Sequence, residues 1–183
     1  MTKSALILID IQNDYFPGGK WELHGMEASA ANARRLLDDA RAKGRLVVHV
    51  RHENERPDAL FFAAGTPGAQ FHPSIQPAAD EPVVVKHKVN AFLGTGLKQL
   101  LDENGITRVT LAGSMSHMCI DAAARAASDF GFEVTVIEDA CSTSRDLEYN
   151  GVTVPAEQTH RAFMAALSFA YASVTGTDAF LSN

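Results

Sequence analysis

The chain has 183 residues and a formal net charge of −6, which is a typical size for one domain with a full core, and we expect a single domain over residues 1–183. An isoelectric point near 5.6 argues against nucleic-acid binding, because phosphate groups require a concentrated basic surface. The sequence contains no apolar run long enough to span a membrane or to form the core of a signal peptide, so we expect a cytoplasmic protein without a membrane partner.

Short β-branched runs alternate with helical patterns along the chain. The predicted strands cover residues 5–9, 46–50, 83–85, 109–112, 134–137 and 173–175. The predicted helices cover residues 27–43, 97–104, 116–130 and 155–171, and glycine follows each of the first three. Continuous apolar strands are typical of parallel sheets that are buried on both faces. The alternation therefore predicts a doubly wound α/β fold.

Residues 53–81 break this rhythm, because they show no clear period and are rich in proline and glycine. A structureless segment of this length is unusual in a compact domain and often forms a lid or an oligomer arm. The alternative is a meandering connection whose phenylalanines, Phe61, Phe62 and Phe71, anchor it to the core.

Three chemically active side chains follow predicted strands. Asp10 follows the first strand, Lys86 follows the third, and Cys119 lies in the segment after the fourth. Ligands of open α/β sheets bind at the carboxyl ends of the strands, so we expect these three side chains at one edge of the sheet. Lys88 is the competing candidate for the role of Lys86.

Cys119 is the candidate nucleophile. With Ser116 as N-cap, Cys119 would lie in the first turn of the helix, where free N–H groups and the helix dipole favour a thiolate. The alternative is an inert buried cysteine that packs as a small apolar side chain. We expect Cys141 to have that packing role, and we expect both cysteines to be free thiols in a reducing compartment.

The remaining candidates are an acid and several histidines. Asp10 could act as a general base or orient a cation, although aspartate at a strand end is also common as a turn residue. Asp10 could also form a metal site with His52 and His72, but no close ligand spacing supports one. His117 lies two positions before Cys119, so on a helix it would project to a different side.

Three segments resemble the isochorismatase-like cysteine hydrolases. Residues 10–16, DIQNDYF, resemble the family's D-x-Q-N-D-F opening. Residues 85–95, VKHKVNAFLGT, resemble its K-x-x-x-S-A-F-x-G-T block, with Asn90 in the serine position. Residues 113–120, GSMSHMCI, resemble its G-x-x-T/S-x-x-C-V nucleophile turn, and residues 137–140 match the strand end that follows.

The resemblance implies a three-layer α/β/α architecture, Rossmann-like, with a six-stranded parallel sheet and a homodimeric or homotetrameric assembly. It implies a catalytic triad of Asp10, Lys86 and Cys119, and it favours Lys86 over Lys88. It also implies a cis peptide between Ser114 and Met115, with the backbone amides of Met115 and Cys119 forming an oxyanion hole.

One departure from the family concerns metal. Nicotinamidases carry Asp-x-His after the second strand, whereas this chain has Arg51 in the aspartate position. The departure argues against a metal and against nicotinamide as substrate, and no cofactor is expected.

These observations predict a hydrolase that cleaves a small-molecule amide or related C–N bond through a thioester on Cys119. The alternatives are a non-catalytic small-molecule-binding protein on the same fold and an isochorismatase-type vinyl-ether hydrolase. A thiol that reacts only well above about pH 8.5 would favour the binding protein. The expected substrate contacts are mainly aromatic: Phe16, Trp21, Phe61, Phe62 and His117.

Overall fold

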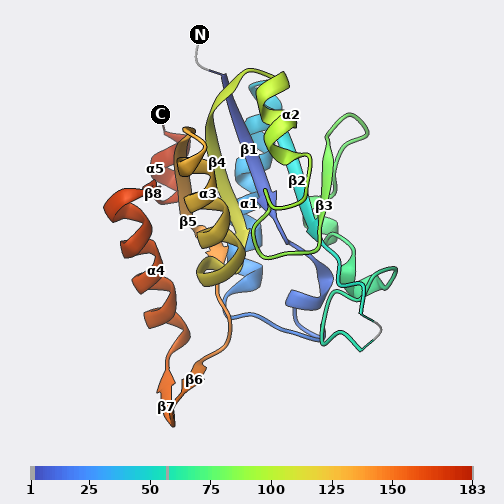
Figure 1. Ribbon diagram of the computed structural model, residues 1–183, viewed down its shortest axis with the longest axis vertical. Helices are drawn as coiled ribbons and strands as arrows, with labels where there is room; N and C mark the ends of the chain where they lie inside the picture. The colour runs from blue at the N-terminus through green and yellow to red at the C-terminus, as the bar shows by residue number, and fades with distance from the viewer. Residues whose placement is uncertain (1–2, 57, 183) are drawn as a thin grey trace.

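The computed structural model describes residues 3–56 and 58–182 and contains a central parallel sheet of six strands (Figure 1). The strand order is β3-β2-β1-β4-β5-β8, and every neighbouring pair is parallel. This arrangement confirms the predicted doubly wound sheet. The strands are β1 (Lys3–Ile9), β2 (Leu46–His52), β3 (Val83–Lys86), β4 (Ile106–Ser114), β5 (Glu133–Ser142) and β8 (Ser173–Thr175).

Helices cover both faces of the sheet, which makes the three layers α/β/α. On one face α1 (Met26–Ala42) packs with α5 (Thr177–Leu181), and on the other lie α2 (Leu97–Glu103), α3 (Asp121–Asp129) and α4 (Ala156–Ala170) (Figure 1). Each face therefore has its own apolar cluster, with the sheet between them. The described part of the chain has no helix with the length and hydropathy needed to cross a bilayer.

The helix predicted over residues 116–130 begins differently from expectation. Residues Ser116–Ile120 form a single π-helical turn, η4, and α3 begins at Asp121. Met115, in extended conformation, is the N-cap, and its carbonyl oxygen accepts hydrogen bonds from the amides of Met118 and Ile120. The predicted N-cap role of Ser116 is therefore wrong. The Ser116 hydroxyl is buried and has no hydrogen-bond partner among the described residues.

The segment at residues 53–81 is packed against the body of the protein. It contains two short 3₁₀ turns, η2 (Pro67–Ala69) and η3 (Pro73–Ile75), and Phe71 forms a bridge with Gln12. Phe62 is fully buried and Phe71 nearly so. The structure thus supports a connection anchored by phenylalanines rather than a free arm, with Pro57 outside the described residues.

A small hairpin extends from the body at the lower end of Figure 1. It consists of β6 (Leu147–Tyr149) and β7 (Val152–Val154), which pair antiparallel. Its two turn residues, Asn150 and Gly151, have φ of 52° and 74°. Asn-Gly is the residue pair that a tight turn with two left-handed residues favours. The predicted strands and helices did not include this hairpin.

Candidate active site

Asp10 directly follows the last residue of β1, Ile9. Its φ is 54°, a left-handed conformation that aspartate tolerates better than most residues, and its N–H donates to the carbonyl oxygen of Val50 at 2.9 Å. On the neighbouring strand, Gly113 is in register with Ile9 and has φ of 129°. A β-carbon at Gly113 would overlap the carbonyl oxygen of Ile9. The absence of a side chain at this position therefore lets β4 approach the end of β1.

The ammonium group of Lys86 lies at the centre of the site. Its Nζ is 2.9 Å from Oδ2 of Asp10 and 3.3 Å from Sγ of Cys119. It also lies 3.0 Å from Nδ1 of His52 and donates to the backbone carbonyl of Lys88 at 3.1 Å. The structure therefore brings together the three residues of the predicted triad. The Lys88 side chain is exposed, and only its backbone contributes.

The ion pair between Asp10 and Lys86 has no accessible surface on either side chain. Burial alone would lower the pKa of Lys86, but the carboxylate of Asp10 and the nearby sulfur outweigh it, so the pKa is raised. Lys86 is therefore charged at neutral pH. Oδ1 of Asp10 is buried and accepts no hydrogen bond from any described residue, which leaves it available as a proton acceptor.

The thiol of Cys119 differs from the expectation drawn from its position. Burial raises its pKa, and the Asp10 carboxylate raises it further, while Lys86 acts in the opposite direction with a smaller effect. The resting side chain is therefore a neutral thiol, and the predicted thiolate-favouring effect of the helix start does not prevail. Cys141 is buried on β5, and burial raises its pKa to about 12.

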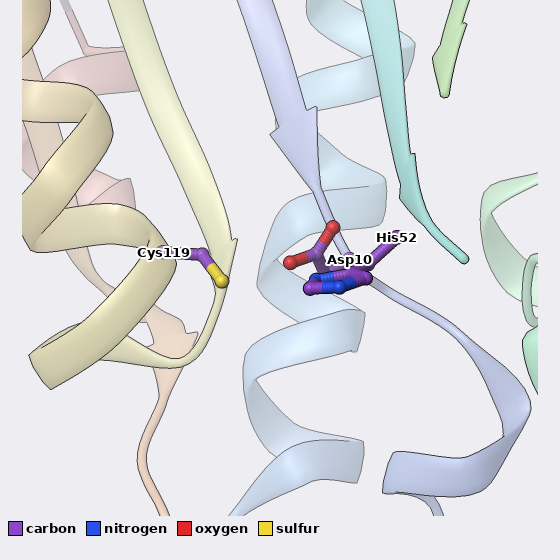
Figure 2. A group of neighbouring side chains, drawn as sticks. All are labelled: Asp10, His52 and Cys119. Atoms are coloured by element: carbon purple, nitrogen blue, oxygen red, sulfur yellow. The ribbon is translucent and has the colours of Figure 1, made fainter. Parts of the chain in front are cut away.

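His52, which was a candidate metal ligand, contacts the lysine instead. One donor atom each of Asp10, His52 and Cys119 lie within 4.8 Å of one another, and Figure 2 shows these side chains facing a common space. The ammonium of Lys86 contacts all three, so a cation already occupies the position that a metal ion would need. His72 is not part of this group; its ring is stacked on Phe16.

Two buried polar residues after β1 hold the surrounding backbone, and the sequence analysis assigned them no role. Gln12 fixes the end of β2 by two hydrogen bonds. The side-chain amide of Gln12 donates to the carbonyl oxygen of His52 and accepts from the N–H of His52. Asp14 accepts a hydrogen bond from the N–H of Phe62 at 2.7 Å. A β-carbon at Gly68 would overlap the Asp14 carboxylate. The only signal in the sequence was their place in the D-x-Q-N-D motif.

The five predicted substrate contacts are not equivalent. Phe62 has no accessible surface, so it belongs to the core and its predicted contact with substrate is corrected to packing against Tyr15. Phe16 is also buried, under His72. Trp21 and Phe61 are half-buried, and their rings are in tilted contact with centroids 5.1 Å apart. For these two residues, substrate contact stays a prediction.

His117, the fifth predicted contact, is half-buried and makes none of the contacts described above for Asp10, Lys86 and Cys119. Its Nδ1 lies 3.2 Å from the Thr143 hydroxyl, and its ring meets Phe163 edge-on.

A separate cavity of about 680 Å³ has Arg145 in its lining, and the Arg145 guanidinium lies over the Trp21 ring. The triad is not part of that lining.

The peptide bond between Ser114 and Met115 is cis, which confirms the expectation from the resemblance. It directly precedes the π-helical turn that carries Cys119.

A profile of the isochorismatase domain matches residues 4–179. The chain belongs to the isochorismatase family of hydrolases. It is 47% identical over 178 residues to the family protein YddQ of Bacillus subtilis, which covers 97% of this chain and 98% of that protein. It is 33% identical over 151 residues to the maleamate amidohydrolase of Pseudomonas putida, covering 75% of this chain and 71% of that protein.

A solved structure has the same fold as this chain. A crystal structure of a protein from Oleispira antarctica, described as an isochorismatase hydrolase, superposes with a TM-score of 0.95 at 49% sequence identity. The match covers 100% of this chain and 97% of that one. The six-stranded sheet is therefore the fold of this family.

Proposed function

We propose that this protein is a cysteine hydrolase that cleaves a small-molecule amide or related C–N bond through a thioester on Cys119. The observation that carries the proposal is the contact of one buried ammonium, that of Lys86, with both the Asp10 carboxylate and the Cys119 sulfur. An acid, a base and a thiol in contact at the carboxyl ends of parallel strands are suited to nucleophilic acyl transfer.

In the proposed reaction, the Asp10 carboxylate removes the proton of Cys119 as the sulfur attacks the carbonyl carbon. Lys86 stabilises the thiolate as it forms, which offsets the burial that keeps the resting thiol neutral. Asp10 then gives the proton to the leaving amine, and a thioester remains on Cys119. A water molecule, deprotonated by Asp10, attacks this thioester and releases the acid.

We assign the stabilisation of the tetrahedral oxyanion to the backbone amides of Met115 and Cys119. Met115 is the N-cap of η4, and Cys119 is the fourth residue of this single turn. The N–H groups of a first helical turn are suited to binding an anion. Such donors are typically worth about 3–4 kcal/mol in the transition state. The neighbouring amides of Met118 and Ile120 already donate to the Met115 carbonyl.

The resemblance to maleamate amidohydrolase supports amide chemistry, because the name of that relative describes C–N bond cleavage. The presence of Cys119 favours acyl transfer over vinyl-ether hydrolysis, which needs no thiol nucleophile. A non-catalytic binding protein is the remaining alternative. Because burial raises the pKa of the Cys119 thiol, slow alkylation of the resting protein is expected for an enzyme as well as for a binding protein. A measurement of turnover is therefore needed to distinguish the two.

The test is a screen for amidase activity over nicotinamide, N-carbamoyl compounds, ureido compounds and small aliphatic amides. We expect ammonia or amine release by the native protein and none by Cys119→Ala. Mass spectrometry of a slow substrate should show the acyl adduct on Cys119. Turnover by Cys119→Ala at the native rate would refute the thioester, and no turnover of any compound would favour the binding protein.

We also propose that the protein forms a homodimer or homotetramer, which light scattering would reveal.

A further inference from the structure

His52 has a hydrogen-bond arrangement that the triad chemistry does not require. Its Nδ1 lies 3.0 Å from Nζ of Lys86. An ammonium group carries only N–H donors, which here are shared among four neighbouring atoms, so in this contact Nδ1 must be the acceptor and cannot carry a proton. The proton of the neutral ring is therefore on Nε2, and Lys86 selects this tautomer.

The ring is neutral as well as fixed in tautomer. Burial and the charge of Lys86 lower the pKa of His52 to about 4, so the ring carries no charge at neutral pH. The backbone of His52 is held on both sides by Gln12, at 2.8 Å from its N–H and 2.9 Å from its carbonyl. The ring is thus a rigid donor with a defined direction.

No described residue accepts a hydrogen bond from Nε2 of His52, although the ring is only half-buried and lies beside the reacting groups. Figure 2 shows the imidazole extending from the end of β2 below Asp10, on the side that faces Cys119. We propose that the Nε2–H of His52 is a substrate-binding donor, which recognises an oxygen acceptor on the acyl group close to the scissile carbonyl. This inference rests on the proposed hydrolysis at Cys119.

The arrangement specifies a class of substrate. A hydrogen-bond donor loses its contact with water when substrate fills the site. It therefore discriminates against an acyl group that has only carbon at the matching position, because that group leaves the donor without a partner. The preferred substrates are therefore amides that carry a carbonyl or carboxylate oxygen a few bonds from the scissile carbonyl. Simple aliphatic amides of the same shape are poor substrates, because they leave Nε2–H without a partner.

Two substitutions separate the two nitrogens of His52. In His52→Asn the side-chain oxygen takes the position of Nδ1, so the Lys86 contact is kept, and the shorter side chain places no donor at the position of Nε2. In His52→Gln the amide group reaches the position of Nε2, so a donor is kept there. His87→Leu is a matched control, since it removes an exposed histidine next to Lys86 whose ring contacts Glu53 and Glu55 rather than the ammonium.

The experiment compares two neutral amides, levulinamide, with a ketone oxygen, and isocaproamide, with a methyl group in its place. We expect native protein to favour levulinamide in kcat/KM by about tenfold. His52→Asn should abolish this preference while keeping the native rate of Cys119 alkylation by iodoacetamide. His52→Gln should keep part of the preference, and His87→Leu all of it. A full preference in His52→Asn would overturn the proposal.

Nitrogen NMR of the imidazole tests the donor without any turnover. We expect protonated Nε2 and unprotonated Nδ1, and a shift of the Nε2–H resonance when levulinamide is added to Cys119→Ala protein. A protonated Nδ1, or an Nε2–H resonance that does not respond to levulinamide, would overturn the proposal. A native protein that binds levulinamide at His52 would support the donor even if it hydrolysed neither amide, and that result together with no turnover in the amide screen would refute the proposed activity.

Discussion

The Asp10 carboxylate and the Lys86 ammonium lie 2.9 Å apart, and neither side chain has any accessible surface. Removing one partner from such a pair leaves an uncompensated charge in a medium of low polarity. The pair is thus as important for stability as for the chemistry we propose.

Lys86→Met should lower the free energy of unfolding by about 3–5 kcal/mol, because Asp10 would remain buried without a counterion. Denaturant unfolding measures this value. The double variant Asp10→Asn/Lys86→Met should recover part of the loss, since neither charge remains. Lys88→Met, at the exposed lysine, is the control and should change stability by less than about 0.5 kcal/mol.

Asp10→Asn should lower kcat by a factor of about 10²–10⁴, because an amide cannot accept the proton of Cys119. The change is close to isosteric, but it leaves the Lys86 ammonium buried without a counterion. The kinetics are therefore compared at a temperature at which circular dichroism shows the variant to be folded. Steady-state kinetics on the best substrate of the screen provides the measurement. A kcat equal to the native value would rule out Asp10 as the base.

Cys141→Ala should keep native kcat and one alkylation site per chain, whereas Cys119→Ala should lose both. Cys141 is buried on β5 and makes no contact with the Asp10–Lys86 pair among the described interactions. Peptide mapping after iodoacetamide treatment distinguishes the two thiols. Modification of Cys141 in the folded Cys119→Ala variant would contradict the assignment of Cys141 as a packing residue.

Gly113→Ala should destabilise the protein by more than about 3 kcal/mol and abolish activity, because the new β-carbon would overlap the carbonyl of Ile9 at the end of β1. Gly131→Ala is the matched control: it also has a positive φ, of 86°, but nothing lies within 4 Å of its β-carbon. The control should cost only about 1 kcal/mol. Chemical denaturation of both variants tests the difference.

Acid should destabilise the protein partly through Glu81. Hydrogen bonds from Arg41 lower its folded-state pKa to about 2, against an unfolded value of 4.5. A depressed carboxyl pKa contributes stability that is present above pH 4.5 and is lost as the pH falls toward 2. Glu81→Gln should therefore show a shallower fall of the unfolding free energy over this window. Equal slopes in both proteins would contradict the assignment.

The sheet, and the meeting of Asp10, Lys86 and Cys119 at one of its edges, were predictable because both follow from local patterns. Each apolar run became a strand, and Asp10 follows one of them directly. The contact between His52 and Lys86 was not predicted, because the two residues are 34 positions apart. It depends on the register of β2 against β3, which places His52 directly beside Lys86. No local pattern reports that register.

The predictions for the start of the helix that carries the nucleophile were wrong for a different reason. A serine followed by a helical pattern predicts an N-cap at Ser116, but the backbone makes a π-helical turn there. The thiol environment was likewise mispredicted, because burial and the Asp10 carboxylate outweigh the position in the turn. The second outcome depends on the pairing of β1 with β4, which brings Asp10 near Cys119 and which a single segment of sequence does not contain.

The β6–β7 hairpin offers a practical route to labelling this protein. Asn150 and Gly151 form an exposed turn, and the hairpin forms a sheet of its own, apart from the six strands that carry the triad. A peptide epitope or a short fluorophore-binding sequence inserted between these two residues would lengthen a turn without crossing the core. Such a tagged protein would allow the chain to be immobilised or followed while Asp10, Lys86 and Cys119 keep their arrangement.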